Sequence, residues 1–212
     1  IINMYVFKGD IILSGDQVSA RIANKGIGLE SLINRWPDNT VYYWFGNYFP
    51  YKSRVIDAIK YWERNTPIKF VESDKNFPLV IFQWDKAGCY SSLGMNKSQD
   101  FINNQVIGIA DWADVGTVIH EIGHTIGLVH ENSKPDRDQY ISLDLQNVQQ
   151  GKAHYFQKVS SRFVTTQFDF NSIMLFSSYF ISEKGLPTSK KKDVSIYEVQ
   201  RKAVSQDAIN LL

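Results

Sequence analysis

The stretch His120-Glu121-Ile122-Gly123-His124-Thr125-Ile126-Gly127-Leu128-Val129-His130 is the most informative part of this 212-residue sequence. Because an α-helix turns by about 100° per residue, His120 and His124 would lie on one face, one turn apart. Two imidazoles placed in this way supply half of a tetrahedral zinc site. Glu121 is too close in sequence to be a convenient third ligand. It is placed where a carboxylate can hold a zinc-bound water and accept its proton.

The residues that follow complete the pattern of a catalytic zinc site. Gly127 allows the chain to leave the helix, because glycine reaches positive φ without steric cost. The turn would bring His130 round as a third nitrogen ligand. Three histidines and one open position are typical of a catalytic zinc, whereas structural zinc sites are closed by four protein ligands. Two hydrogen-bonded histidines on an amphipathic helix could produce HExxH alone, but the longer pattern HExxHxxGxxH takes three of the four histidines in the chain.

The sequence after the third histidine carries a family resemblance. Residues 130–141 read His-Glu-Asn-Ser-Lys-Pro-Asp-Arg-Asp-Gln-Tyr-Ile and resemble the signature of the astacin family, a branch of the metzincin zinc proteases. Lys134 stands where that family usually has arginine. A second stretch, Phe170–Met174, resembles the metzincin Met-turn, in which Met174 would form a hydrophobic floor beneath the imidazoles. The resemblance extends from about Phe7 to the C-terminus.

The N-terminal residues resemble an astacin pro-segment. Phe7, Gly9 and Asp10 form the motif Phe-x-Gly-Asp. The resemblance implies that the Asp10 carboxylate occupies the open zinc position and keeps the enzyme latent. This is chemically reasonable, because a carboxylate binds zinc and a glycine lets the backbone approach closely. The alternative is an ordinary N-terminal strand with an aspartate in a turn.

The resemblance also implies a maturation site. We expect cleavage between Lys25 and Ile27, in a basic run that contains glycine. In the family, the freed N-terminus is buried and interacts with the glutamate that follows the third histidine, here Glu131. The predicted domains are a pro-segment, 1–26, and a catalytic domain, 27–212, with an N-terminal lobe at about 27–130 and a C-terminal lobe at about 131–212.

The hydrophobic pattern predicts alternating strands and helices. Strands are predicted at Val41–Phe45, Ile68–Val71, Leu79–Gln83 and Val106–Ile109, and helices at Ser53–Asn65, from near Asp114 and at Ser195–Leu212. The fold class that we expect is α+β, the two-lobed zincin fold of metzincins. It has a twisted, mostly parallel five-stranded sheet with the active-site helix, followed by an irregular C-terminal lobe that ends in a helix.

One strand is expected to bind substrates. The resemblance implies an edge strand against which an extended peptide aligns antiparallel, followed by a turn at Gly88–Ser91. An unpaired edge strand is a ready surface for such a peptide. The residues assigned to this strand are Leu79, Val80, Ile81, Phe82 and Gln83.

Composition limits the other possibilities. The formal net charge is +1, from 23 Lys+Arg and 22 Asp+Glu, so nothing indicates a nucleic-acid or membrane-surface partner. No apolar run approaches 18 residues, so no membrane span is predicted. The N-terminus lacks the features of a signal peptide, and we expect a secreted monomer whose signal peptide is absent from this chain. Cys89 is the only cysteine, whereas animal astacins typically carry two disulfides, so a bacterial exported enzyme fits better.

The expected function is zinc-dependent endopeptidase, made as a zymogen with one catalytic zinc and its pro-segment bound in cis. Protein or peptide substrates would be hydrolysed by a zinc-activated water, with Glu121 as the general base that later passes the proton to the leaving amine.

The Met-turn departs from the family pattern and leaves an alternative open. Astacins usually read Ser-x-Met-His-Tyr, whereas this chain reads Ser-Ile-Met-Leu-Phe at residues 172–176. In the family that tyrosine is a fifth zinc ligand at rest and stabilises the tetrahedral intermediate, and Phe176 has no hydroxyl for either role. Loss of one such donor typically costs about two to three orders of magnitude in rate. A weakly active or inactive zinc-binding relative is therefore the alternative, unless Tyr179 compensates. A zinc hydrolase of non-peptide substrates is a third possibility.

Overall fold

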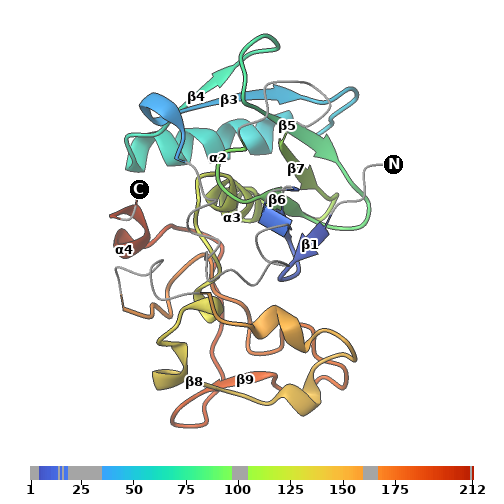
Figure 1. The fold of residues 1–212 in the computed structure, drawn as a ribbon, viewed down its shortest axis with the longest axis vertical. Helices are drawn as coiled ribbons and strands as arrows, with labels where there is room; N and C mark the ends of the chain where they lie inside the picture. The colour runs from blue at the N-terminus through green and yellow to red at the C-terminus, as the bar shows by residue number, and fades with distance from the viewer. Residues whose placement is uncertain are drawn as a thin grey trace. The chain divides into compact units, whose positions relative to one another are not determined.

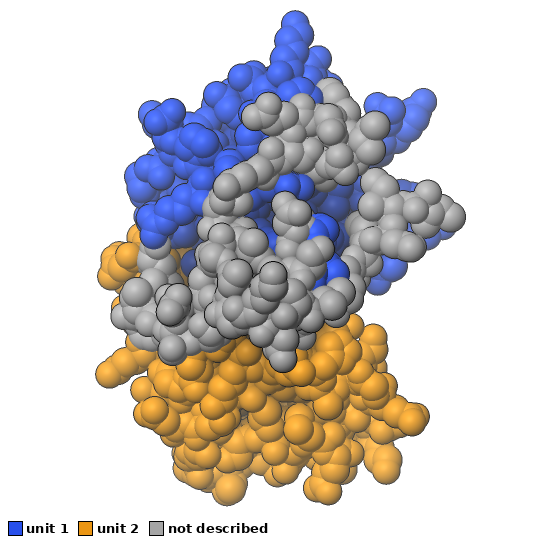
Figure 2. All heavy atoms as spheres, in the orientation of Figure 1, with its two compact units in different colours: residues 1–128, 212 blue, residues 129–211 orange. Residues whose placement is uncertain are grey.

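The computed structural model describes residues 5–13, 15, 17–18, 35–96, 105–159, 167–210 and 212. The chain divides into two compact units, which we call unit 1 (residues 1–128 and 212) and unit 2 (residues 129–211), coloured separately in Figure 2. The predicted maturation site lies outside the described residues. The predicted division into lobes after His130 lies close to the boundary between the units, and its functional meaning remains a prediction.

Unit 1 is built on one mixed sheet (Figure 1). Its described strands are β1 (Tyr5–Phe7), β2 (Ile11–Leu13), β3 (Thr40–Phe45), β4 (Lys69–Glu72), β5 (Leu79–Trp84), β6 (Tyr90–Ser92) and β7 (Gln105–Ile109). They lie in the order β1-β2-β6-β7-β5-β3-β4. Strands β4, β3, β5 and β7 run parallel, β6 is antiparallel to β7, and β2 is parallel to β6. The predicted α+β fold with a mostly parallel sheet is confirmed.

The number of strands differs from the prediction. The described part of the sheet has seven strands rather than five. The N-terminal segment adds β1 and β2, which form an antiparallel hairpin, and β6 lies where a turn was expected. Each of these three strands has only three residues. Runs of this length are too short to show an alternating pattern, so their pairing partners decide that they are strands.

The prediction that Leu79–Gln83 forms the substrate-binding edge is wrong. Strand β5 pairs with β3 on one side and with β7 on the other, so it lies inside the sheet. Its sequence already fits this position, because Leu79, Val80 and Phe82 are buried and point alternately to both faces. Strands buried on both faces read as continuous apolar runs. Without the hairpin β1–β2, strand β6 would form one end of the described sheet, and with it β6 is paired with β2.

Two helices lie on one side of the sheet (Figure 1). Helix α2 (Lys52–Asn65) buries the apolar face predicted from its periodicity, and Trp62 donates its indole N–H to the Ile119 carbonyl of α3 (Val115–Thr125) at 3.1 Å. The helix begins at Lys52, one residue before the predicted start at Ser53, and Tyr51 occupies the N-cap position without a side-chain cap. Among the described residues, no helix has both the length and the hydropathy needed to span a membrane.

Unit 2 contains short elements joined by turns. They are η3 (Glu131–Ser133), η4 (Arg137–Gln139), β8 (Ile141–Leu143), η5 (Leu145–Asn147), η6 (Ala153–Phe156), β9 (Ser189–Lys191) and α4 (Gln206–Ile209). Strands β8 and β9 pair antiparallel. A small apolar cluster lies beside this pair and contains Ile141, Phe168, Leu175 and Tyr197.

The C-terminal helix is much shorter than predicted. Of the stretch Ser195–Leu212, only Gln206–Ile209 is helical among the described residues. The Gln200 side-chain carbonyl accepts the backbone N–H groups of Lys202 at 2.8 Å and Ala203 at 2.9 Å. Local side-chain bonds of this kind give the backbone an alternative to helical pairing. The apolar periodicity of this stretch therefore did not decide its conformation, and of its periodic positions only Val204 and Ala208 are buried.

Candidate metal centre

Helix α3 begins where the sequence predicts. Asp114 is its N-cap, and the Asp114 carboxylate accepts the backbone N–H of Thr117 at 2.7 Å. Such a cap satisfies one of the free N–H groups at a helix start. Val118 and Ile122 are completely buried and anchor the helix in unit 1. The helix is therefore a fixed support for the side chains that it carries.

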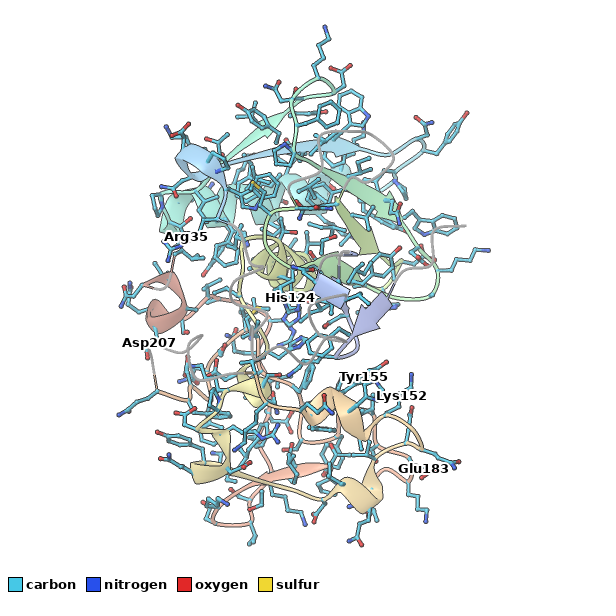
Figure 3. The ribbon with its side chains drawn as sticks, viewed as in Figure 1. Arg35, His124, Lys152, Tyr155, Glu183 and Asp207 are labelled. Atoms are coloured by element: carbon cyan, nitrogen blue, oxygen red, sulfur yellow. The ribbon has the colours of Figure 1, made fainter. Side chains whose placement is uncertain are left out.

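Both predicted histidine ligands project from α3. His120 and His124 are buried, and their rings meet edge to face with centroids 4.8 Å apart. His124, labelled in Figure 3, directs Nδ1 toward the Leu128 carbonyl at 2.8 Å. A carbonyl only accepts, so this bond places the proton on Nδ1 and leaves the Nε2 lone pair for a metal.

The predicted glycine turn ends the helix. Gly127 has a φ of 109°, a conformation that other residues rarely adopt. Its N–H bonds to the His124 carbonyl, and the Leu128 N–H bonds to the Gly123 carbonyl, each at 2.9 Å. This pair of bonds is a Schellman motif. It also brings the Leu128 carbonyl back to the His124 ring, so the turn orients the ligand as well as ending the helix.

The end of α3 is also tied to neighbouring strands and loops. Thr125 places its hydroxyl 2.8 Å from the buried Ser91 hydroxyl of β6, and its carbonyl accepts the Trp36 indole N–H at 2.9 Å. The Gly94 N–H donates to the His124 carbonyl at 2.9 Å. Sequence reasoning assigned no such role to Ser91, Trp36 or Gly94. Their roles arise from long-range pairing, which leaves no local signal in the sequence.

The N-terminal hairpin brings Asp10 to this helix. Lys8 and Gly9 have φ values of 55° and 98°, which turn the chain sharply between β1 and β2. The Asp10 carbonyl accepts the Ser91 N–H at 2.8 Å. One carboxylate oxygen of Asp10 lies 3.3 Å from His120 Nε2, and the other lies 3.5 Å from His124 Nε2.

These three residues have the donor set and spacing of a zinc site. Ligand atoms of Asp10, His120 and His124 lie within 4.8 Å of one another. Two ligands about 2.0–2.1 Å from a tetrahedral zinc would be about 3.3 Å apart. The two observed nitrogen–oxygen distances are close to this value. The arrangement therefore fits a zinc ion held between the two imidazoles and the carboxylate.

Glu121 and Cys89 lie near this group. Glu121 is buried in α3 next to His120. Burial, with smaller contributions from the charges of Glu121, Asp10 and Asp85, raises the pKa of the Cys89 thiol to about 11, although a hydrogen bond from the Ala110 N–H opposes the shift. The thiol is thus protonated at neutral pH and is a poor nucleophile or ligand.

The third predicted ligand, His130, belongs to unit 2. It is completely buried, and its ring centroid lies 3.9 Å from that of Phe176. Only Val129 separates His130 from Leu128.

The predicted Met-turn is a tight turn in unit 2. The Leu175 N–H bonds to the Ser172 carbonyl at 3.1 Å, and the Met174 N–H bonds to the Ser172 hydroxyl at 3.2 Å. The Glu131 N–H donates to the Met174 carbonyl at 2.9 Å. Met174 itself is buried. A main-chain hydrogen bond therefore connects the turn to the segment that carries His130.

Glu131 has partners of its own in unit 2. Its carboxylate lies 2.5 Å from the Lys134 ammonium and accepts the Asp169 N–H at 2.8 Å. Burial raises the pKa of Glu131, while Lys134 and the Asp169 N–H act in the opposite direction. The lysine that replaces the family's arginine thus neutralises a buried carboxylate.

Phe176 is held by aromatic packing. It is buried and stacks on Phe180 with centroids 3.7 Å apart and planes at 11°. Tyr179 is 42 % exposed, and its backbone N–H bonds to the Ser177 hydroxyl. The replacement of the missing hydroxyl by that of Tyr179 remains a prediction.

Comparison with known proteins gives a family match for most of the chain. Residues 28–211 match the peptidase family described as Astacin. The chain is 34 % identical over 176 residues to "Astacin-like metalloprotease toxin 2" of Loxosceles intermedia, covering 81 % of this chain and 65 % of that protein. It is 34 % identical over 211 residues to "Blastula protease 10" of Paracentrotus lividus, covering 88 % of this chain and 34 % of that protein. The chain thus spans less than two thirds of either relative.

Solved structures agree with the fold. The chain resembles "High choriolytic enzyme 1 (HCE-1), a hatching enzyme zinc-protease from Oryzias latipes", with a TM-score of 0.74 and 22 % identity, covering 84 % of this chain and 92 % of that one. The named relatives are animal proteins, and the expected bacterial origin remains a prediction. Because residues 28–211 match the family, this chain belongs to the astacin family of zinc-dependent peptidases.

Proposed function

We propose that this chain is a zinc-dependent endopeptidase that its own N-terminal segment keeps latent. The observation that carries the proposal is the position of the Asp10 carboxylate, 3.3 Å and 3.5 Å from the Nε2 atoms of His120 and His124. Asp10 reaches them from a separate hairpin that lies 110 residues before His120 in the sequence. A carboxylate at this position blocks the place that a catalytic water needs.

The metal ligands in this proposal are His120, His124 and His130. When bound, zinc polarises the scissile carbonyl and makes a water molecule acidic enough to act as nucleophile at neutral pH. The donor set of three neutral imidazoles is typical of catalytic zinc sites, which keep one position open. The Leu128 carbonyl supports this assignment by fixing the tautomer of His124.

Glu121 is the proposed general base. It follows His120 on α3, whose capped ends hold the side chain in a fixed place. Its carboxylate would accept a proton from the attacking water and pass it to the leaving amine. A positioned base of this kind typically contributes about 10²- to 10⁴-fold to the rate.

The proposed substrate-binding strand is β6. Its outer edge is paired with β2, so the N-terminal segment covers the surface that an extended peptide would use. Strand β2 runs parallel to β6, whereas a family substrate would run antiparallel. Because its peptide bonds run in the opposite direction, we expect the segment to resist cleavage while it is bound.

Maturation completes the proposal. Cleavage between Lys25 and Ile27 would release residues 1–26 and expose both β6 and the zinc position. The new ammonium group would then reach Glu131, whose carboxylate is held by Lys134 in the present state. We further propose that the enzyme is a secreted monomer that acts on proteins or peptides.

Casein hydrolysis tests the proposal directly. We would compare the zinc-loaded intact chain, the chain after limited trypsin treatment with its new N-terminus sequenced, and Asp10→Ala. Asp57→Ala, at an exposed aspartate on α2 of unit 1, is the matched control. We expect activity after trypsin and in Asp10→Ala, and none in the intact chain or the control. Equal activity in all four samples would show that the hairpin is not inhibitory.

A zinc-binding but inactive relative is the second candidate, and Phe176 is the observation that favours it. The Phe176 ring has no hydroxyl and is stacked between His130 and Phe180. This candidate predicts one bound zinc per chain but no cleavage of casein or small peptides after maturation. The zinc content of the matured chain, measured beside its activity, separates the two candidates.

A further inference from the structure

Asn132 makes an unusual set of contacts close to the third proposed ligand. It is 1 % exposed and lies in η3, two residues after His130. Its side-chain oxygen accepts the Phe176 backbone N–H at 2.6 Å, and its side-chain nitrogen donates to the Tyr197 hydroxyl at 3.2 Å. One buried amide thus joins three segments of unit 2 that are far apart in sequence.

The bond to Phe176 bears directly on His130. The Phe176 ring lies against the imidazole, with centroids 3.9 Å apart and planes at 38°. Its other neighbour is Phe180, at 3.7 Å and 11°. The backbone position of Phe176 therefore determines where its ring contacts the His130 imidazole. Asn132, in the short helix η3 that directly follows His130, holds that backbone through its bond to the Phe176 N–H.

Asn132 is itself held from several sides. Arg137 donates through Nη1 to the Asn132 carbonyl at 2.6 Å and also to the Phe156 carbonyl. The Tyr197 hydroxyl lies 2.5 Å from the Ser189 hydroxyl of β9, and the Tyr197 N–H donates to Ser178 at 2.9 Å. A buried network whose members are all bonded has a unique geometry, because breaking any bond leaves a buried polar group exposed to an apolar environment.

We propose that Asn132 is a positioning residue for His130, acting through the backbone and ring of Phe176. The inference rests on the proposed role of His130 as a zinc ligand. In this arrangement Phe176 has a packing role in place of the chemical role that a tyrosine would have. The amide of Asn132 supplies the directional bond that an apolar ring cannot make for itself.

Zinc affinity is the measurement that tests the proposal. Residues that orient a ligand typically change metal affinity by about 10- to 100-fold when removed. Asn132→Leu has nearly the same size but cannot bond to Phe176 or Tyr197, and we expect zinc to bind about tenfold more weakly in a chelator competition. The visible spectrum of the cobalt-substituted protein should change with it, since that spectrum reports ligand geometry.

A matched control separates positioning from general loss of stability. Asn147 lies in η5 of the same unit and donates its amide to the Pro187 carbonyl at 2.8 Å. Asn147→Leu removes a side-chain hydrogen bond of the same kind without touching the His130 network. We expect it to lower the thermal stability but to leave the zinc affinity and the cobalt spectrum unchanged. Equal losses of affinity in both leucine variants would overturn the proposal.

A second variant covers the case in which Asn132→Leu does not fold. Phe176→Leu keeps the backbone N–H that bonds to Asn132 and removes the ring that contacts His130. We expect a similar loss of zinc affinity, and where the double variant folds, no more than the larger single loss. Wild-type affinity in Phe176→Leu contradicts the proposed route.

His130→Ala distinguishes failure of this inference from failure of the proposed function. If His130→Ala binds zinc as tightly as the wild type, the ligand assignment is wrong. If His130→Ala loses zinc while Asn132→Leu and Phe176→Leu bind it normally, the ligand assignment stands and the positioning role is wrong.

Discussion

Units 1 and 2 hold their functional side chains by different means. In unit 1, His120 and His124 sit on a regular helix that is capped by the Asp114 side chain at its start and closed by backbone bonds at its end, and whose apolar face packs into a large core. In unit 2, His130 lies beside turns that are fixed by buried side-chain bonds from Asn132 and Arg137. The first arrangement relies on secondary structure and apolar packing, and the second relies on particular polar side chains.

Tolerance to mutation should differ between the units for this reason. A regular helix keeps its geometry when most single side chains change, because its backbone pairs with itself. A chain segment without regular structure must satisfy its N–H and C=O groups through side chains or turns. We therefore expect unit 1 to be sensitive to loss of apolar volume and unit 2 to be sensitive to loss of individual hydrogen bonds.

The largest expected effect is on the cleavage rate and concerns the proposed general base, which lies in unit 1. Glu121→Gln, in unit 1, should lower the casein-cleavage rate of the matured enzyme by about 10²- to 10⁴-fold, because the amide cannot accept the proton. Met174→Leu, in the Met-turn of unit 2, keeps the apolar volume and should cost less than about 1.5 kcal/mol of stability with activity near wild type. Full activity in Glu121→Gln would show that another group is the base.

Two substitutions test the expected difference in sensitivity. Ile122→Ala removes a completely buried side chain of unit 1 and should destabilise it by about 2–5 kcal/mol. Arg137→Met keeps much of the apolar stem but leaves the Asn132 and Phe156 carbonyls without their donor, each at about 1–3 kcal/mol. Hydrogen exchange on peptides from β5 and β8 would show which unit loses protection. Equal loss in both units for both variants would mean that they unfold together.

A pair of glycine substitutions separates backbone strain from ligand orientation. Gly127 and Gly151 both have positive φ, 109° and 79°. Alanine at either position should cost about 1–3 kcal/mol in strain. Only Gly127→Ala should also weaken zinc binding, since it disturbs the turn that brings the Leu128 carbonyl to His124. Zinc titration of both variants checks this, and unchanged affinity in Gly127→Ala would contradict the role of the turn.

The smallest expected effect depends on pH and concerns the surface of unit 1. Hydrogen bonds from the Tyr51 hydroxyl and the Trp84 indole hold the pKa of Asp111 below its usual range. A carboxyl group with a lowered pKa stabilises the fold above its unfolded pKa of about 3.9, and this contribution is lost as the pH falls through the folded value.

Asp111→Asn should therefore unfold at lower urea concentration than the wild type at pH 7, with the difference shrinking as the pH is lowered below about 4. Asp193 also has a lowered pKa, but it bonds to Ser195 within its own loop of unit 2. Asp193→Asn should show the same sign of pH dependence while changing the protection of unit 2 peptides only. A difference for Asp111→Asn that does not depend on pH would mean that the carboxylate charge is not involved.

The sequence by itself determined the features that depend on local geometry. Four of the strands follow from short runs of apolar, β-branched and aromatic residues, and the two principal helices follow from the local sequence pattern. The placement of His120 and His124 on one helix face, the helix start near Asp114 and the turn at Gly127 follow from spacing within one helix and its ends, where a side chain needs only its own backbone as reference.

Only the tertiary structure decided the features that depend on a partner. The interior position of β5, the pairing of β2 with β6 and the network around Asn132 all join residues distant in the sequence. The C-terminal residues have helical periodicity, yet among the described ones only Gln206–Ile209 is helical, and Gln200 accepts the backbone N–H groups of Lys202 and Ala203. Periodicity reports which side chains are buried, whereas pairing between strands and bonds between side chains depend on what lies opposite, and one sequence does not contain that information in local form.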